Sequence, residues 1–189
     1  MSKRKAQDLL TTKSALKRSK RIKKHNNPLI VNAASSGDLN QVIRLVEDGV
    51  DVNRSVIEGK TALMEACLNE HINVVEYLIA NGAWLNKTDN KTQTALWKMA
   101  SNGQEKMLSL LIHAGADINK PDKTNNWTPL HAAVYEGEME CVEILLKNGA
   151  DDTKVAEYPW RQTAFEMAHQ YPYGVKDTWE TMKNSSLYE

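Results

Sequence analysis

Four glycines divide most of this chain into segments of almost equal length. Gly49, Gly82, Gly115 and Gly149 stand 33, 33 and 34 residues apart, and each lies in a similar phrase of small and polar residues. A repeat of this length is typical of an array in which one small supersecondary unit stacks on the next. Such arrays bind partners along an open surface. The spacing therefore favours a binding protein over a globule with a catalytic cleft.

The fourth segment indicates how one unit is built. Thr128 can cap the start of a helix, and Pro129 suits its first position, where a missing N–H costs nothing. A turn at Gly137 leads to a second stretch with apolar residues at i, i+3 and i+4, which is typical of an amphipathic helix. Gly149 suits the end of that helix, where positive φ is needed. The unit is therefore a pair of helices.

The motif Thr-Pro-Leu-His-x-Ala that begins at Thr128 resembles the signature of the ankyrin-repeat family, and related motifs begin at Thr61, Thr94 and Thr163. The resemblance covers about residues 27–170. It implies an all-α solenoid of helix-turn-helix units with short β-hairpin fingers, comprising four full repeats and a degenerate fifth. Residues 1–26 are expected to form a disordered basic arm, because like charges repel and too little apolar surface is present to offset ordering. Residues 171–189 are expected to form a C-terminal cap and tail.

Glu70 and Trp84 depart from the family pattern, whereas His131 keeps it. Glu70 stands at a turn where the other full repeats have glycine, so a left-handed turn there costs about 1 kcal/mol. Trp84 stands where the other repeats have aspartate, and we expect it, like Trp97, to be structural. His131 is expected to tie the turn below it rather than to act as a general base.

In the ankyrin-repeat family the partner usually binds the concave surface, formed by the fingers and the exposed ends of the first helices. The resemblance therefore implies a protein partner, bound by a monomer. Trp127, Tyr135 and Trp160 are expected to face solvent there and to act as binding hot spots; the alternative is that Trp127 and Trp160 pack against a neighbouring finger. The full set of expected surface residues is Ile57, Glu58, Lys60, Leu68, Asn69, Asn90, Lys91, Gln93, Ser101, Asn102, Thr124, Asn125, Trp127, Tyr135, Glu136, Trp160 and Gln162.

Charge is divided unevenly along the chain. Residues 1–25 hold ten Lys and Arg against one Asp, a net charge of +9, whereas the remainder has 14 basic and 23 acidic residues, a net charge of −9. Two basic clusters at this spacing predict a bipartite nuclear-import signal, bound by an import receptor, and a location in the nucleus, with the cytoplasm as the alternative. The residues of this signal are Lys3, Arg4, Lys5, Lys17, Arg18, Lys20, Arg21, Lys23 and Lys24. The acidic body suggests a partner of basic character.

Two other binding functions remain open. The first is a nucleic-acid or chromatin adaptor, in which residues 1–25 contact phosphates with a steep salt dependence. The arm has no aromatic residues that would stack on bases, which argues against a dedicated single-strand binder. The second is a small inhibitor of a kinase or transcription factor, as known in this family, although no repeat marks a surface for either.

Several classes of protein are not expected. No apolar stretch approaches the length of a membrane span, and no apolar segment follows the basic N-terminus as a secretory signal would require. Cys67 and Cys141 are expected to be buried, reduced thiols. The five histidines are scattered, and no catalytic, metal-ligand or cofactor motif is present. We therefore expect a non-enzymatic protein without cofactor or metal.

The family resemblance also implies one covalent modification, the hydroxylation of asparagine. Asparagines in the setting Leu-x5-Asp-(Val/Ile)-Asn can be hydroxylated by an intracellular asparaginyl hydroxylase, and Asn53 and Asn119 match this setting. The alternative, which we favour, is that these asparagines only stabilise the turn of the finger.

Overall fold

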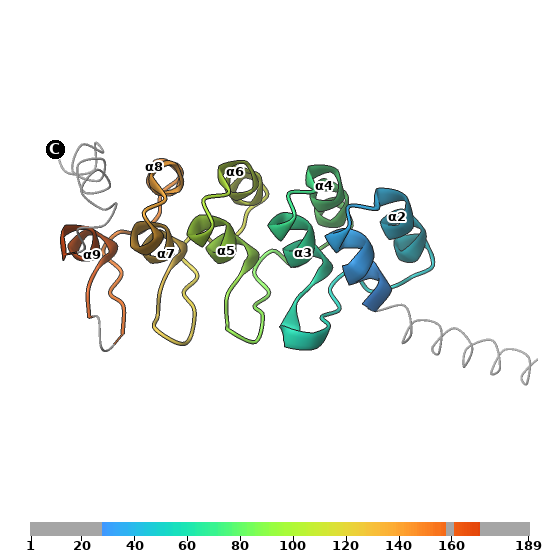
Figure 1. Ribbon diagram of the computed structural model, residues 1–189, viewed down its shortest axis with the longest axis horizontal. Coiled ribbons are helices and arrows are strands. Elements are labelled where there is room, and N and C mark those ends of the chain that lie inside the picture. The colour runs from blue at the N-terminus through green and yellow to red at the C-terminus, as the bar shows by residue number, and fades with distance from the viewer. Residues whose placement is uncertain (1–27, 158–160, 171–189) are drawn as a thin grey trace, which may run out of the picture.

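The computed structural model describes residues 28–157 and 161–170 and arranges them as a single row of helical pairs (Figure 1). The first helix is described over residues 28–35. The elements that follow are α2 (Leu39–Glu47), the 3-10 turn η1 (Ile57–Gly59), α3 (Ala62–Leu68), α4 (Ile72–Ala80), α5 (Ala95–Ser101), α6 (Glu105–His113), α7 (Pro129–Glu136), α8 (Met139–Lys147) and α9 (Ala164–Gln170). This arrangement confirms the expected all-α solenoid.

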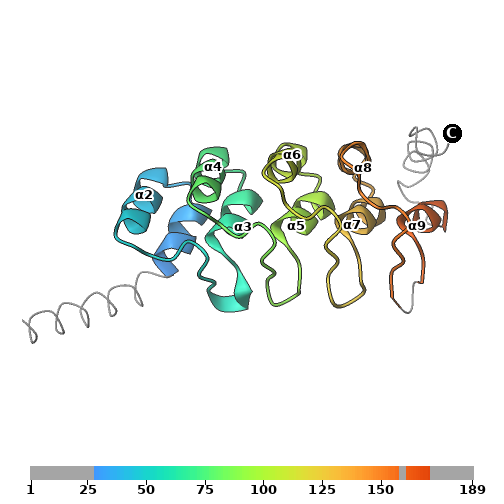
Figure 2. The same ribbon diagram turned by 180° about the vertical axis from the view of Figure 1, so that it is seen from behind.

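The helices form two layers that run the length of the row. The inner helices α3, α5, α7 and α9 lie side by side, and the outer helices α2, α4, α6 and α8 lie above them in Figure 1. The loop from each outer helix to the next inner helix extends away from the outer layer, as both Figure 1 and the reverse view in Figure 2 show. We call these loops fingers; they span residues 48–61, 81–94 and 114–128 and, in the described part of the last one, residues 148–157 and 161–163.

Threonine caps determine where the inner helices begin. The Oγ1 atoms of Thr61, Thr94 and Thr128 accept hydrogen bonds from backbone N–H groups three residues later, at 3.2, 3.1 and 3.4 Å. Each bond satisfies a donor that the first turn of a helix leaves unpaired. Pro129 occupies the first turn of α7, as its missing N–H allows.

The turn between inner and outer helices has left-handed backbone geometry in every full repeat. Gly37, Gly103 and Gly137 have φ values of 73°, 67° and 80°, and Glu70 adopts the same region at 58°. The glutamate therefore carries the steric penalty that the glycines avoid, as the sequence predicted.

The core lies between the two layers and continues from one repeat to the next. Ala62, Ala95 and Ala133 on inner helices are 0, 1 and 0 % exposed, and Leu78 and Leu111 on outer helices are fully buried. Small alanines allow the helices to approach closely, so each repeat covers the apolar side of its neighbour.

The fingers are largely irregular in the described part of the chain. Antiparallel bridges join Ser55 to Thr61 and Val155 to Thr163 at the bases of the first and last fingers. Regular backbone pairing is thus confined to short contacts, and side chains hold the fingers in shape.

The two cysteines are buried in the helical layers. Desolvation raises the pKa of the Cys67 thiol to about 12, and burial beside acidic residues does the same for Cys141. Both thiols are therefore protonated and inert at neutral pH, as the sequence predicted. Among the described residues, no helix is long and apolar enough to cross a membrane.

Candidate functional site

Buried aspartates shape the second and third fingers. Asp89 Oδ1 accepts hydrogen bonds from the backbone N–H groups of Lys91 and Gln93, at 2.9 and 3.0 Å. Asp122 Oδ1 accepts from Thr124 and Asn125, at 3.1 and 2.9 Å. A side chain that closes its own loop in this way fixes the backbone without a β ladder.

Neighbouring fingers are joined to one another by hydrogen bonds. Backbone N–H of Asn90 donates to the carbonyl of Glu58 at 2.8 Å, Lys123 N–H donates to Thr92 Oγ1 at 2.6 Å, and Glu157 N–H donates to the carbonyl of Asn125 at 2.8 Å. The fingers therefore form one continuous surface rather than separate flexible loops.

The ends of the inner helices supply the second part of this surface. Asn69, Asn102 and Glu136 are exposed at equivalent positions of three successive repeats, and Leu68 is half-buried beside Asn69. Tyr135 is 41 % exposed. These expected binding residues thus lie along one strip that crosses the repeats.

Two further expected surface residues are held by polar contacts. Lys60 Nζ lies 3.1 Å from Glu58 and 3.3 Å from Glu65. The hydrogen bond that Lys60 donates to Glu58 and the charge of Glu65 raise the pKa of Lys60. Gln93 Oε1 accepts a hydrogen bond from Lys98 Nζ at 2.9 Å. The side chains of this part of the surface are therefore preorganised.

Trp127 differs from its expected position. It is only 7 % exposed, and its ring packs against Tyr135 with centroids 4.8 Å apart. The expectation that its indole faces solvent is wrong, because neighbouring side chains cover the ring, among them Tyr135 of α7. Trp160, the other expected aromatic, lies outside the described residues.

The remaining tryptophans divide between the two roles. Trp97 is half-buried, and its Nε1 donates to the backbone carbonyl of Trp127 at 3.0 Å, a structural contact. Trp84 is 62 % exposed, so the expectation that it packs structurally is wrong. Lys87 Nζ lies 5.4 Å from the centroid of the Trp84 ring. The sequence did hold a signal for this exposure, because Trp84 stands where other repeats have an aspartate at the start of an exposed loop.

His131 is a structural residue. Its Nδ1 accepts from the backbone N–H of Thr128 at 3.3 Å, which completes a capping box, and its Nε2 lies 3.3 Å from the carbonyl of Gln162 in the next repeat. Burial lowers the pKa of the imidazole, which favours the neutral form needed for this pair of bonds. Among the described residues, no group of His, Cys, Asp and Glu has the arrangement of a metal site.

Asparagines connect the loops of successive repeats, whereas the sequence predicted only that they stabilise the turn of one finger. Asn53 Oδ1 accepts from Trp84 N–H at 2.6 Å, and Asn119 Oδ1 accepts from Asp151 N–H at 2.7 Å. Asn86 makes the same bond to Asp117 at 2.8 Å. The amides of Asn53 and Asn119 are thus engaged structurally, and their hydroxylation stays a prediction.

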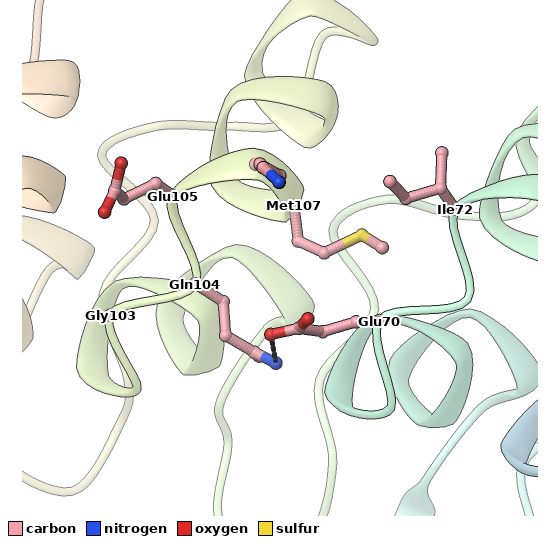
Figure 3. A pocket seen from close by; sticks show the side chains of 7 residues that line it. Glu70, Ile72, Gly103, Gln104, Glu105 and Met107 are labelled. Carbon is pink, nitrogen blue, oxygen red and sulfur yellow. Dashed lines mark hydrogen bonds between the residues drawn. The ribbon is translucent and has the colours of Figure 1, made fainter.

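A hollow of about 340 Å³ lies beside the turn between α3 and α4, away from the fingers (Figure 3). Gln104 Nε2 donates to Glu70 Oε1 at 3.2 Å on one side of it, and the apolar side chains of Ile72 and Met107 lie on another. Among the described residues, no metal-binding cluster lies here. The hollow is a groove lined by residues of two successive repeats.

The nine residues of the expected import signal all lie outside the described part of the chain. Of the two expected binding regions, the structure therefore describes only the surface formed by the fingers and the inner helices. A finger and the end of an inner helix recur in successive repeats.

Comparison with known proteins gives the family directly. A family model for ankyrin repeats (3 copies) matches residues 4–89 and 84–156, which is most of the chain. The comparison with curated proteins found no match. Since the family model and the stacked helical pairs agree, the chain belongs to the ankyrin-repeat family, whose members generally act as non-enzymatic modules that bind other proteins.

Proposed function

We propose that this protein is a nuclear scaffold that binds a partner protein on its concave surface. We define this surface as the ends of the inner helices together with the fingers. The partner lies across several repeats at once, because no single repeat offers enough area for a stable interface.

The observation that carries this proposal is the strip of exposed side chains at equivalent positions. Asn69, Asn102 and Glu136 follow one another across the repeats, and Tyr135 adds a partly exposed aromatic ring. Tyrosine is enriched at binding hot spots because its ring buries a large area and its hydroxyl makes a hydrogen bond. A partner that covers Tyr135 would also contact both asparagines.

The nuclear part of the proposal is supported by sequence. Lys3, Arg4 and Lys5 form one basic cluster, and a second begins at Lys17 and ends at Lys24. Two such clusters on one chain suit the acidic grooves of an import receptor. In this proposal residues 1–25 direct import, and the repeats bind the partner.

Affinity purification with nuclease treatment tests the binding function. The intact protein is compared with Asn102→Ala/Tyr135→Ala and with the control Glu76→Ala/Lys106→Ala, whose two exposed residues lie on outer helices. We expect a protein that survives nuclease, is lost with the first variant and is retained by the control. If the recovered proteins are lost after nuclease treatment but are retained by both variants, the function is assigned to nucleic-acid binding instead.

A further inference from the structure

Two neighbouring fingers contain more lysine than their surroundings. Residues 87–93 and 120–126 hold Lys87, Lys91, Lys120 and Lys123, and their only acidic residues are one aspartate each. Lys91 and Lys123 are exposed, and Lys120 is half-buried. We call these last three residues the central lysine patch. It belongs to the part of the chain whose net charge is −9, so its sign is opposite to that of its surroundings.

The aspartates within residues 87–93 and 120–126 do not offset the patch at the surface, although Asp117, three residues before Lys120, is exposed. Asp89 and Asp122 are 7 and 5 % exposed. Asp89 Oδ2 lies 2.8 Å from the amine of Lys98, which neutralises its charge inside the protein. Asp122 Oδ1 is already occupied by backbone N–H groups. Both carboxylates are therefore committed to holding the loops, and a partner meets the lysines instead.

The lysines of the patch have no ion-pair partner among the described residues. The flanking fingers differ: Lys60 pairs with Glu58 and Glu65, and Lys154 lies 3.7 Å from Asp151. Lys87 is also engaged, because its Nζ donates to the carbonyl of Asn53 at 2.6 Å. Among the described lysines of the fingers, Lys91, Lys120 and Lys123 are thus the ones without an ion pair or a side-chain hydrogen bond.

The patch is also held in place. Lys123 N–H donates to Thr92 Oγ1 at 2.6 Å, so the two fingers are joined at the residues that carry the charge. The inner helices α5 and α7 pack side by side, and packed helices lie about 8–10 Å apart. Lysines on neighbouring fingers can therefore contact successive acidic residues of one extended chain.

We propose that the central lysine patch binds an acidic protein segment, rich in Asp and Glu, of the partner that the concave surface holds. This inference rests on the proposed function and names the chemistry of the partner. It differs from the basic partner that the overall charge of the body suggested, because the central lysine patch has the opposite sign to the body as a whole. Lysines at such a surface steer an acidic chain and fix its register.

A nucleic acid fits the patch less well. Base stacking needs exposed aromatic rings, and residues 87–93 and 120–126 contain none. The exposed Glu58 and Glu157 on the flanking fingers would repel a polyanion that extended beyond the patch. An acidic peptide segment is short enough to avoid them.

Fluorescence anisotropy on the full chain tests this proposal. The probe is a labelled peptide of alternating Glu and Ser, and the variants are Lys91→Gln/Lys123→Gln and the charge-matched control Lys106→Gln/Lys147→Gln, both of whose lysines are exposed on outer helices. The basic residues 1–25 are common to all variants, so a difference in affinity between the variants reports on the repeats. We expect the first variant to bind about fivefold to tenfold more weakly and the control to be nearly unchanged.

Equal affinity for both variants would overturn the proposal, since the peptide would then bind through the arm or through charge in general. The proposal would also be overturned if Lys91→Gln/Lys123→Gln lost binding of a single-stranded oligonucleotide but kept binding of the acidic peptide. That result would assign the patch to nucleic acid. The proposed function is tested separately through Asn102 and Tyr135. If binding of a partner requires Asn102 and Tyr135 but neither Lys91 nor Lys123, the proposed concave surface stands. Only the proposed acidic segment is then overturned.

Discussion

The indole of Trp127 packs against the ring of Tyr135, with centroids 4.8 Å apart and ring planes inclined by 52°. The tryptophan is 7 % exposed and the tyrosine 41 %. The buried tryptophan therefore packs beneath the surface, whereas the tyrosine ring is partly exposed to solvent. This division gives opposite expectations for two substitutions that look alike in the sequence.

Replacing Trp127 by alanine is expected to lower the free energy of unfolding by about 3 kcal/mol, because it leaves a large cavity under the third finger. Replacing Tyr135 by alanine is expected to cost about 1 kcal/mol or less while abolishing capture of the partner. Thermal denaturation and affinity purification measure the two effects. A stable Trp127→Ala variant that loses the partner would show that the indole itself is the contact.

Local patterns allowed much of the fold to be predicted. Thr128, Pro129 and His131 act within one helical turn, so their spacing alone indicates the cap. The burial of Trp127 depends instead on its contact with Tyr135, eight positions later, and on the path of the finger, neither of which the cap motif defines. The hydrogen bond from Trp84 N–H to Asn53 Oδ1 likewise joins residues 31 positions apart and needs two stacked repeats.

Glu70 adopts a φ of 58° at a turn where its equivalents are glycines. Glu70→Gly is therefore expected to raise the free energy of unfolding by about 0.5–1 kcal/mol, because glycine enters this region without a steric penalty. The matched control is Glu76→Gly in the middle of α4, which should lower it by about 1 kcal/mol. Urea denaturation measures both. If Glu70→Gly were destabilising, its hydrogen bond with Gln104 would matter more than the backbone.

Glu138 introduces a dependence of stability on pH. His71 and Gln104, its equivalents in the preceding repeats, lie 3.0 and 3.2 Å from the carbonyls of Ser35 and Leu68. A carboxylate has no proton to donate to such a group. Burial raises the pKa of Glu138, and the charges of the neighbouring glutamates raise it further.

Because the pKa of Glu138 is higher in the folded state, its protonated form stabilises the fold at low pH, and this contribution is lost as the pH rises through the folded pKa. Glu138→Gln is therefore expected to raise Tm by a few degrees at about pH 7 and to have no effect at about pH 3. Glu140→Gln, on the same helix, is the control and should have a smaller effect. An equal gain at both pH values would contradict the role of titration.

Deletion of residues 1–25 tests the import signal. We expect Tm and helicity of the deleted protein to be nearly unchanged, while a fluorescent fusion moves from the nucleus to the cytoplasm. Replacing only Lys3, Arg4 and Lys5 by glutamine should give the same redistribution with little change in length. A large loss of helicity after deletion would show instead that the arm packs on the repeats.

Site-specific photo-crosslinking tests the central claim, that the partner binds the concave surface. A photoreactive amino acid replaces Asn69 at the end of α3, which the affinity test leaves unchanged, or, as a control, Glu76 on the outer helix α4; both positions are exposed. The account predicts that the same protein is crosslinked from position 69 with and without nuclease treatment, and that position 76 gives no such product. Crosslinking of that protein from position 76 alone would place the partner on the outer helices and contradict the account.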